Sequence, residues 1–545
     1  MGKISSTRYA LVLAGLIALL GGVGLAKGGL YIDRFEGDTA YMVDMVARMV
    51  MGQVPHVDFE TPIGLMALVP VAVMAKAGFG IGQAFIAGQI LVALILAPMV
   101  WRVGTSRLTG VTSWVFGVVC IALVLALVHG EDMLSVSVSM YYNRWAWVMA
   151  FVAILLAVVP PHDDHVNPRL DGVFIALALT GLAMSKPTYF VAFFVPIVLA
   201  LVMRRAVSSL VFGVIAGALC AALIALFFGV GIFEAYIGDL LTVARSETRA
   251  APGLPLAQII NGPKFLVATI VAILSVVVLR QSGQDRAGLL LMLLLPGFIY
   301  VTYQNFGNDP KWLILLAIYL LAHRPARGVR VLFNADGKSA LNALALVSFA
   351  LIMPSLQNIV TSPFRHLSEN TQNYSVLMSD APKFNDVFAF NERSNVVFAR
   401  RILADEIPAL DDYQAESKAR EVTTFLGEAL PRCALVSGDT AVDTYIADRL
   451  KQSPFNFAPE TQFYMADVAS MVWMIGGFAP LKGGAPWYYA GTPGLENADA
   501  IVVPLCAHSV QYRKAALSAL EGAGLRVLAP IRDDLFLVYP IVRGD

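Results

Sequence analysis

Long apolar segments constrain this chain more than any other feature, because about 20 consecutive apolar residues are what a helix needs to cross a bilayer. Hydrophobic residues make up 57% of the 545 residues and charged residues only 14%. Apolar segments lie near residues 9–26, 63–77, 81–100, 111–128, 145–159, 172–184, 189–203, 207–232, 265–279, 287–302, 312–322 and 340–355. The sequence therefore predicts a polytopic membrane protein, with 9–26 as an uncleaved first helix rather than a signal peptide.

The basic connectors between these segments predict the orientation of the chain, since cytoplasmic loops collect Lys and Arg. The four strongest are "WRVGTSR" (101–107), "MRR" (203–205), "RQSGQDR" (280–286) and "HRPARGVR" (323–330). With all four inside, the loop 27–62 and everything after residue 356 lie outside. These positions are inconsistent with a full crossing by 63–77: either this segment is re-entrant, as its prolines and glycine permit, or one connector is misassigned. The exact count stays open, at about 11–13 spans.

The composition changes near residue 355, after which no long apolar run follows. We expect a mostly α fold: a transmembrane helix bundle over residues 1–355 and a soluble extracytoplasmic (periplasmic) α/β domain over 356–545. Within the second part, "CALVSG" (433–438) and "AIVVPLC" (500–506) predict buried strands. The stretch 509–524 predicts an amphipathic helix that ends at a glycine, and a closing hairpin follows it.

Charge and cysteine usage exclude some classes of function. The formal net charge is zero, so nucleic acid is not an expected partner. No cysteine has metal-ligand spacing, and neither do the scattered histidines; we expect no metal and no cofactor. Cys433 and Cys506 fall in the tail and are able to pair if that tail lies outside the cytoplasm.

Charged residues gather in the loops predicted to lie outside. The first of these loops carries Glu36, Asp38, Asp58 and Glu60. The other outside loops contribute the candidate donor-binding residues Asn143, Arg144, Lys186, Arg245, Arg249 and Lys311, and the first loop adds Tyr41. Carboxylates and cations on one membrane face suit a reaction that needs a base and a clamp for an anionic group.

The first loop also resembles a known family. "EGDTAYM" (36–42) followed by "GQVPHVDFETPIG" (52–64) is similar to the first extracytoplasmic loop of the GT-C superfamily of integral-membrane glycosyltransferases. "YYNRW" (141–145) and "SKPTY" (185–189) fit the same pattern, and the resemblance covers roughly residues 1–355. One departure is Thr61, where several family members have Lys or His.

The resemblance implies an activity and roles for particular residues. Asp38 occupies the position of the catalytic aspartate, with Glu36 beside it, and Asp58 and Glu60 match the second acidic element. The donor would be a polyprenyl-phosphate or -pyrophosphate sugar, and the acceptor a glycan, lipid or protein of the cell envelope. A single displacement would invert the anomeric carbon. The enzyme would sit in the inner (cell) membrane among its lipids, with an extracytoplasmic active site and no divalent metal.

The acidic residues also have simpler interpretations. Asp38 is able to cap a helix over 39–51 and to favour its dipole. Asp58 and Glu60 are equally compatible with a solvated turn. These alternatives stay open at the level of the sequence.

The basic residues likewise have structural interpretations. Arg144 precedes two tryptophans and is able to anchor a helix at the interface, and Lys186 is able to snorkel. Arg245 and Arg249 would then contact lipid headgroups from a loop of about 30 residues that is also long enough to be a flap. Lys311 would pair with the aspartate two residues before it.

Two other functions are compatible with a polytopic chain of this kind. A transporter or flippase of lipid-linked sugars usually places charges within its spans and often has internal repeats. Here the predicted spans are nearly free of charge, and no repeat is evident. An assembly protein with a membrane anchor would need far fewer spans. The sequence therefore favours an enzyme.

Overall fold

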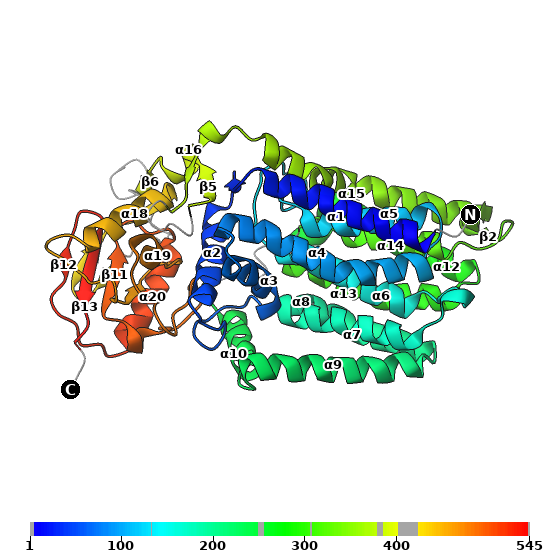
Figure 1. Cartoon of the computed structure of the whole chain (residues 1–545), viewed down its shortest axis with the longest axis horizontal. Helices are drawn as coiled ribbons and strands as arrows, with labels where there is room; N and C mark the ends of the chain where they lie inside the picture. The colour runs from blue at the N-terminus through cyan, green and yellow to red at the C-terminus, as the bar shows by residue number, and fades with distance from the viewer. Residues whose placement is uncertain are drawn as a thin grey trace, which may run out of the picture.

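The computed structural model describes residues 5–131, 133–248, 255–305, 308–378, 385–401 and 423–542, and it is mostly helical. A bundle of long helices forms one part, and a C-terminal mixed α/β region lies at one end of it (Figure 1). We call that end of the bundle the domain end. The opposite end, where the chain starts and where β2 (Arg330–Val331) pairs with β3 (Ala335–Asp336), is the far end.

Eight helices in the described ranges are long and apolar enough to cross a membrane. They are α1 (Ser6–Ala26), α4 (Ile81–Ser106), α6 (Tyr141–Val158), α7 (Pro168–Ser185), α9 (Val207–Phe228), α12 (Pro263–Gln281), α13 (Asp285–Gln304) and α15 (Gly337–Ser368). Three shorter apolar helices, α5 (Val111–Leu125), α8 (Pro187–Met203) and α14 (Trp312–Ala322), pack on α4, α13 and α15 within the same bundle. The chain is therefore a multi-pass membrane protein. Helix length and hydropathy support eight spans, fewer than the 11–13 predicted.

Burial separates a central helix from a peripheral one. Every residue of α6 is buried, whereas in α9 only Ser209 and Ile224 are. Because α9 is apolar all round and exposes most of its side chains, those side chains face the hydrocarbon of the bilayer.

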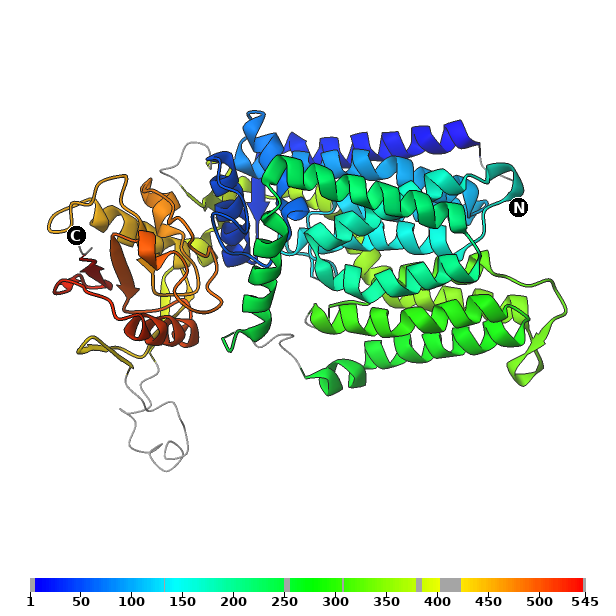
Figure 2. The ribbon, with the colours of Figure 1, turned by 90° about the horizontal axis from the view of Figure 1, so that it is seen from below.

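Short helices cover the domain end. Figures 1 and 2 show α2 (Glu36–Val50) and α10 (Ile232–Arg245) lying across it, between the bundle and the C-terminal region. α3 (Leu65–Lys76) has only 12 residues. Its chain enters and leaves at the domain end: Gly64 N donates to Ser185 O before it, and Gly82 N donates to the Asp386 carboxylate after it. The predicted re-entrant course of 63–77 agrees with this path.

The C-terminal region contains the predicted strands and helix, but only the strand at 500–504 is buried throughout. The strand at 433–437 lies at the surface, with Val436 56% exposed, so its predicted burial was wrong. Its four-stranded sheet has the order β10-β11-β13-β12, with β10 parallel to β11 and the other pairs antiparallel. The strands of this region are β6 (Phe398–Arg401), β7 (Thr423–Phe425), β8 (Glu428–Leu430), β9 (Cys433–Ser437), β10 (Phe463–Met465), β11 (Ala500–Pro504), β12 (Ile531–Arg532) and β13 (Phe536–Pro540). Its helices are α16 (Asn391–Ser394), α18 (Asp439–Leu450), α19 (Val472–Gly476) and α20 (Val510–Gly522), while α11 (Leu256–Asn261) precedes α12 in the bundle. Cys433 and Cys506 form a disulfide.

A small sheet ties the first loop to the C-terminal region. β1 (Leu30–Ile32) pairs in parallel with β5 (Val387–Phe390), which pairs antiparallel with β4 (Tyr374–Val376). The boundary expected at residue 355 falls inside α15, which continues to Ser368.

Helix α2 is held to the C-terminal region by buried charges. Arg48 Nε lies 2.6 Å from Asp44 Oδ1, and Arg48 Nη1 donates to Leu481 O at 2.8 Å. Asp44 Oδ2 accepts a hydrogen bond from Trp473 Nε1 at 2.9 Å. The hydrophobic core continues from the bundle through α2 into this region.

Candidate functional site

A cavity of about 280 Å³ lies at the domain end, and we call it the Asp38 cavity. It is lined by Asp38, Tyr41, Met42, Pro62, Ile63, Ser139, Met140, Tyr142, Lys186, Trp487, Tyr489 and Tyr512. The lining comes from α2, the loop before α3, the start of α6 with the loop before it, the break between α7 and α8, and the C-terminal region. Three predicted site residues, Asp38, Tyr41 and Lys186, thus share one cavity.

Asp38 lies in the first turn of α2, which begins at Glu36. The residue at the N-cap is Phe35, in the left-handed conformation with φ of 60°, and it makes no side-chain cap. Asp38 is therefore not the cap that the sequence allowed. Its carboxylate accepts a hydrogen bond from the Ser139 hydroxyl at 2.6 Å.

Lys186 lies at the break between α7 and α8 and is half-buried. Its ammonium sits 5.5 Å from the centre of the Tyr142 ring, a distance at which a cation is attracted to a ring face. Of the residues that line the cavity, Asp38 carries the negative charge and Lys186 the positive charge.

Aromatic side chains form much of the remaining wall. The Tyr41 hydroxyl lies 2.8 Å from Thr61 Oγ1 and 3.3 Å from the Tyr489 hydroxyl. Its ring meets Trp487 edge-on at 5.6 Å. Burial raises the pKa of Tyr41 well above its ordinary value, so the hydroxyl stays protonated. Sequence reasoning missed Trp487 and Tyr489; the aromatic run at 487–489 was the available signal.

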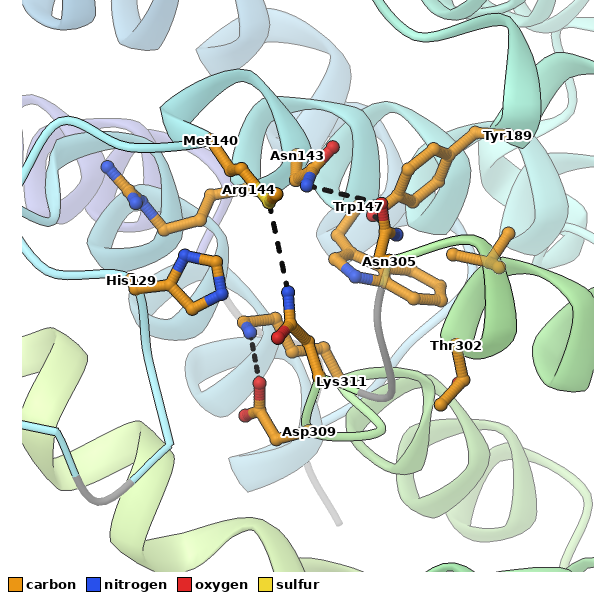
Figure 3. Close-up of a pocket in the computed structure, with 12 residues that line it drawn as sticks. His129, Met140, Asn143, Arg144, Trp147, Tyr189, Thr302, Asn305, Asp309 and Lys311 are labelled. Atoms are coloured by element: carbon orange, nitrogen blue, oxygen red, sulfur yellow. Dashed lines mark hydrogen bonds and ion pairs between the residues drawn. The ribbon is translucent and has the colours of Figure 1, made fainter. Parts of the chain in front are cut away.

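A second, much smaller polar pocket adjoins the Asp38 cavity, and both contain Met140. Its volume of about 20 Å³ is room for one water molecule. It is lined by His129, Met140, Asn143, Arg144, Trp147, Tyr189, Val301, Thr302, Asn305, Asn308, Asp309 and Lys311. Figure 3 shows His129 and Arg144 on one side of the pocket and Tyr189, Thr302 and Asn305 on the other.

Two cations that line this polar pocket, Arg144 and Lys311, make buried contacts with other protein groups. The Arg144 guanidinium donates to Val128 O at 2.6 Å and to Ala126 O at 2.7 Å, and its Nε has no hydrogen-bond partner among the described residues. Lys311 forms a buried ion pair with Asp309, as one sequence interpretation allowed. Arg144 and Lys311, both predicted to bind the donor, are thus engaged with the protein itself in this structure.

An apolar groove of about 570 Å³ runs along α7, α8 and α9. It is lined by Ile175, Ala176, Leu179, Thr180, Ala183, Met184, Phe190, Phe194, Ile197, Val198, Leu201, Ser209, Leu210, Gly213, Val214, Gly217, Ala218, Ala221, Ile224 and Phe233. Small residues of α9 open it, since Gly213, Gly217 and Ala221 recur every four residues on one helix face. Its lining includes Met184, two residues before Lys186 in the chain.

Two of the predicted acids serve contacts outside the Asp38 cavity. Glu36 pairs with Arg393 of the C-terminal region, with Nη2 2.7 Å from Oε1 and Nε 3.0 Å from both oxygens. Asp58 accepts a hydrogen bond from Val54 N at 2.8 Å within a turn, which agrees with the simpler interpretation of that residue.

Glu60 also lies outside the lining of the Asp38 cavity. Burial, with smaller contributions from Asp239 and Glu496, raises the pKa of Glu60 to about 7. The Glu60 carboxyl therefore changes its protonation state near neutral pH. Its backbone N donates to Gly484 O, so it too lies against the C-terminal region.

Asp239 of α10 is a residue that sequence reasoning missed. Its Oδ2 lies 2.8 Å from His56 Nδ1 and accepts a hydrogen bond from Thr61 N at 2.9 Å. Asp239 thereby fixes the loop that supplies Pro62 and Ile63 to the Asp38 cavity. Its signal in the sequence was weak: it is one of two acids, with Glu234, on an amphipathic helix.

The remaining predicted cations do not line the Asp38 cavity. Arg245 is exposed in the last turn of α10. Arg249 lies outside the described residues. Within the described ranges, no group of three His, Cys, Asp or Glu side chains is placed to hold a metal ion.

The fold and its cavities define a class: a multi-pass membrane protein whose C-terminal α/β region completes a polar cavity at the end of its helix bundle. Comparison with protein-family models, with curated proteins and with solved structures gives no match to this chain.

Proposed function

We propose that this protein is a membrane glycosyltransferase of the GT-C type. It would move a sugar from a polyprenyl-phosphate or -pyrophosphate donor to a glycan, lipid or protein acceptor of the cell envelope. The observation that carries the proposal is a juxtaposition: Asp38 and Lys186 line one cavity, and the lining of an apolar groove includes Met184, two residues before that lysine in the chain.

The apolar groove suits the donor's tail. A polyprenyl chain is long, flexible and apolar. One wall of the groove is α9, a helix that exposes most of its side chains to lipid. A tail lying along α7, α8 and α9 would bring its phosphate to Lys186. The ammonium would stabilise the negative charge that develops on the leaving phosphate.

Asp38 suits the role of general base. The acceptor hydroxyl would attack the anomeric carbon and pass its proton to the Asp38 carboxylate, while the bond from carbon to phosphate oxygen breaks and the phosphate leaves with the electron pair. Ser139 orients the carboxylate through its hydrogen bond. One such displacement inverts the configuration of the anomeric carbon.

The aromatic wall suits the acceptor. Trp487, Tyr489 and Tyr512 reach the cavity from the C-terminal region, and flat rings with polar tips present an apolar surface together with hydrogen-bonding groups. This region would therefore hold the acceptor opposite the donor.

The distribution of charge supports the proposed orientation. Arg102 lies near the end of α4 and Arg107 follows it, while Arg204 follows α8 and Arg324 follows α14. These helix ends lie at the far end of the bundle (Figure 1). A cytoplasmic far end satisfies the preference of Lys and Arg for inside loops. The Asp38 cavity and the C-terminal region would then be extracytoplasmic.

Asp38→Asn tests the proposal. In nanodiscs, turnover is measured with a panel of radiolabelled polyprenyl-phosphate sugars, and binding is measured with unglycosylated decaprenyl phosphate. We expect turnover to fall by roughly 10²–10⁴-fold, the usual contribution of a general base, with decaprenyl phosphate binding unchanged. Glu234→Gln is the matched control, because Glu234 is an exposed acid in the first turn of α10.

Lys186→Gln separates the two roles, since it should weaken decaprenyl phosphate binding as well as turnover. Donor-dependent transfer by Asp38→Asn at the wild-type rate would contradict the proposal. If wild type and Asp38→Asn both move lipid-linked sugar across the bilayer, and neither transfers the sugar to an acceptor, the protein is a flippase.

A further inference from the structure

A second polar pocket lies at the far end of the bundle, away from the Asp38 cavity. Its volume is about 380 Å³, within the range of small-ligand sites. Arg107 follows α4, His162 follows α6, Arg324 follows α14, and Lys338 is in the first turn of α15. We call it the far-end pocket.

The charge of this pocket is one-sided. Arg107, His162, Arg324 and Lys338 line it, and none of the described residues in its lining is acidic. In the described part of the chain, the Lys338 ammonium has no hydrogen bond or ion pair. Asp336, two residues before Lys338, caps α15: its carboxylate accepts a hydrogen bond from Ser339 N at 3.0 Å.

The charge immediately behind the wall of the pocket is also positive. Asp171 is 2.8 Å from Arg102 Nε and 2.7 Å from Arg107 Nη2. Arg204 lies beside the same group, where it donates to Ala157 O at 2.7 Å. One carboxylate therefore faces three guanidinium groups. Asp171 neutralises one of the three guanidinium charges. The C-terminus of α6 offsets only part of the other two, because a helix C-terminus carries about half a negative charge.

Two further features of the lining suit a phosphate. Thr109 and Thr112 supply hydroxyl groups. Thr112 lies in the first turn of α5, whose N-cap is Gly110 and has no side-chain cap, and the first turn of a helix favours a nearby anion. The rest of the lining is apolar, from leucine, alanine and proline side chains. The pocket thus combines cations with an apolar edge at the level where the helices leave the membrane.

We propose that the far-end pocket binds the phosphate headgroup of an anionic phospholipid. A basic pocket between helix ends, open at the membrane surface, is the setting in which such headgroups bind. Arg324 and Lys338 contact the phosphate, and the apolar edge receives the first carbons of the acyl chains. This lipid is distinct from the proposed glycosyl donor, because the groove along α7, α8 and α9 and the far-end pocket share no lining residue.

The test uses the purified full-length chain and counts bound lipid by native mass spectrometry. The probes are cardiolipin, phosphatidylcholine and inorganic phosphate. We expect cardiolipin to bind and phosphatidylcholine to bind far more weakly. Each surface cation contributes a factor of roughly 5 to such binding, so Arg324→Gln with Lys338→Gln should weaken cardiolipin binding roughly 30-fold.

Arg327→Gln with Arg330→Gln is the matched control, since both arginines are exposed at the same end and neither lines the pocket. If the double pocket variant fails to fold, Lys338→Gln alone should still weaken binding roughly 5-fold. Equal cardiolipin affinity in pocket and control variants would overturn the proposal. Displacement of cardiolipin by millimolar inorganic phosphate would show a site for free phosphate instead.

Discussion

Arg48 joins α2 to the C-terminal region, and its replacement should release that region. The Arg48 and Asp44 side chains are each only 1% exposed, so solvent screens their attraction little. Besides Asp44, the guanidinium contacts Leu481 O and lies 5.2 Å from the Trp473 ring. Arg48→Met would leave the Asp44 charge buried without its cation.

The expected cost follows from this geometry. Removing one partner of a buried ion pair destabilises by about 3–5 kcal/mol. For a unit of 150–250 residues, 1 kcal/mol corresponds to roughly 2–4 °C in Tm. Arg48→Met should therefore lower the Tm of the C-terminal region by at least about 6 °C. Differential scanning fluorimetry in detergent measures this, because Trp473 lies at the contact.

A double variant tests the reasoning. Asp44→Asn with Arg48→Met removes both charges, so it should be less destabilised than Arg48→Met alone. An Arg48→Met protein within about 2 °C of wild type would refute the argument, and so would a double variant whose loss equals the sum of the single losses.

Three further predictions concern the same face of the molecule. The pKa of Glu60 is raised to about 7 from 4.5, so its ionisation costs the folded state and wild-type stability falls as pH rises from about 4.5 to 7. Glu60→Gln should therefore gain about 1–2 kcal/mol on wild type at pH 8, after allowance for solvent screening; parallel Tm–pH curves would contradict this. Reduction of the disulfide Cys433–Cys506, which spans 73 residues, should cost the C-terminal region about 2–5 kcal/mol in chemical denaturation, whereas an unchanged midpoint would contradict the expected restraint. Trp487→Ala should raise the acceptor KM about tenfold without changing donor binding, and an equal loss for both substrates would remove Trp487 from acceptor recognition.

The sequence predicts local features of this protein well. Apolar run length gives the helices of the bundle, and a re-entrant course for 63–77 was one of two ways to reconcile the four basic connectors with the first helix. The strands at 433–437 and 500–504 and the helix at 510–522 follow from hydrophobic pattern. The sequence also places Cys433 and Cys506 in one region, where they pair.

Contacts between distant segments were not predictable from pattern. The pairing of Glu36 with Arg393 spans 357 residues, and that of Asp239 with His56 spans 183. A charge in a loop has the same local signature whether it binds a substrate or docks a domain. Composition also placed the domain boundary at 355, because the amphipathic last third of α15 is no longer apolar enough to be recognised as part of a membrane helix.

Photocrosslinking with a decaprenyl phosphate that carries a diazirine in its first isoprene units tests the proposed donor site most directly. We expect adducts on the groove residues of α7, α8 and α9, with labelling reduced in Lys186→Gln and competed by unmodified decaprenyl phosphate. Adducts spread over the outer surfaces of α1, α4 and α12, insensitive to Lys186→Gln, would contradict it.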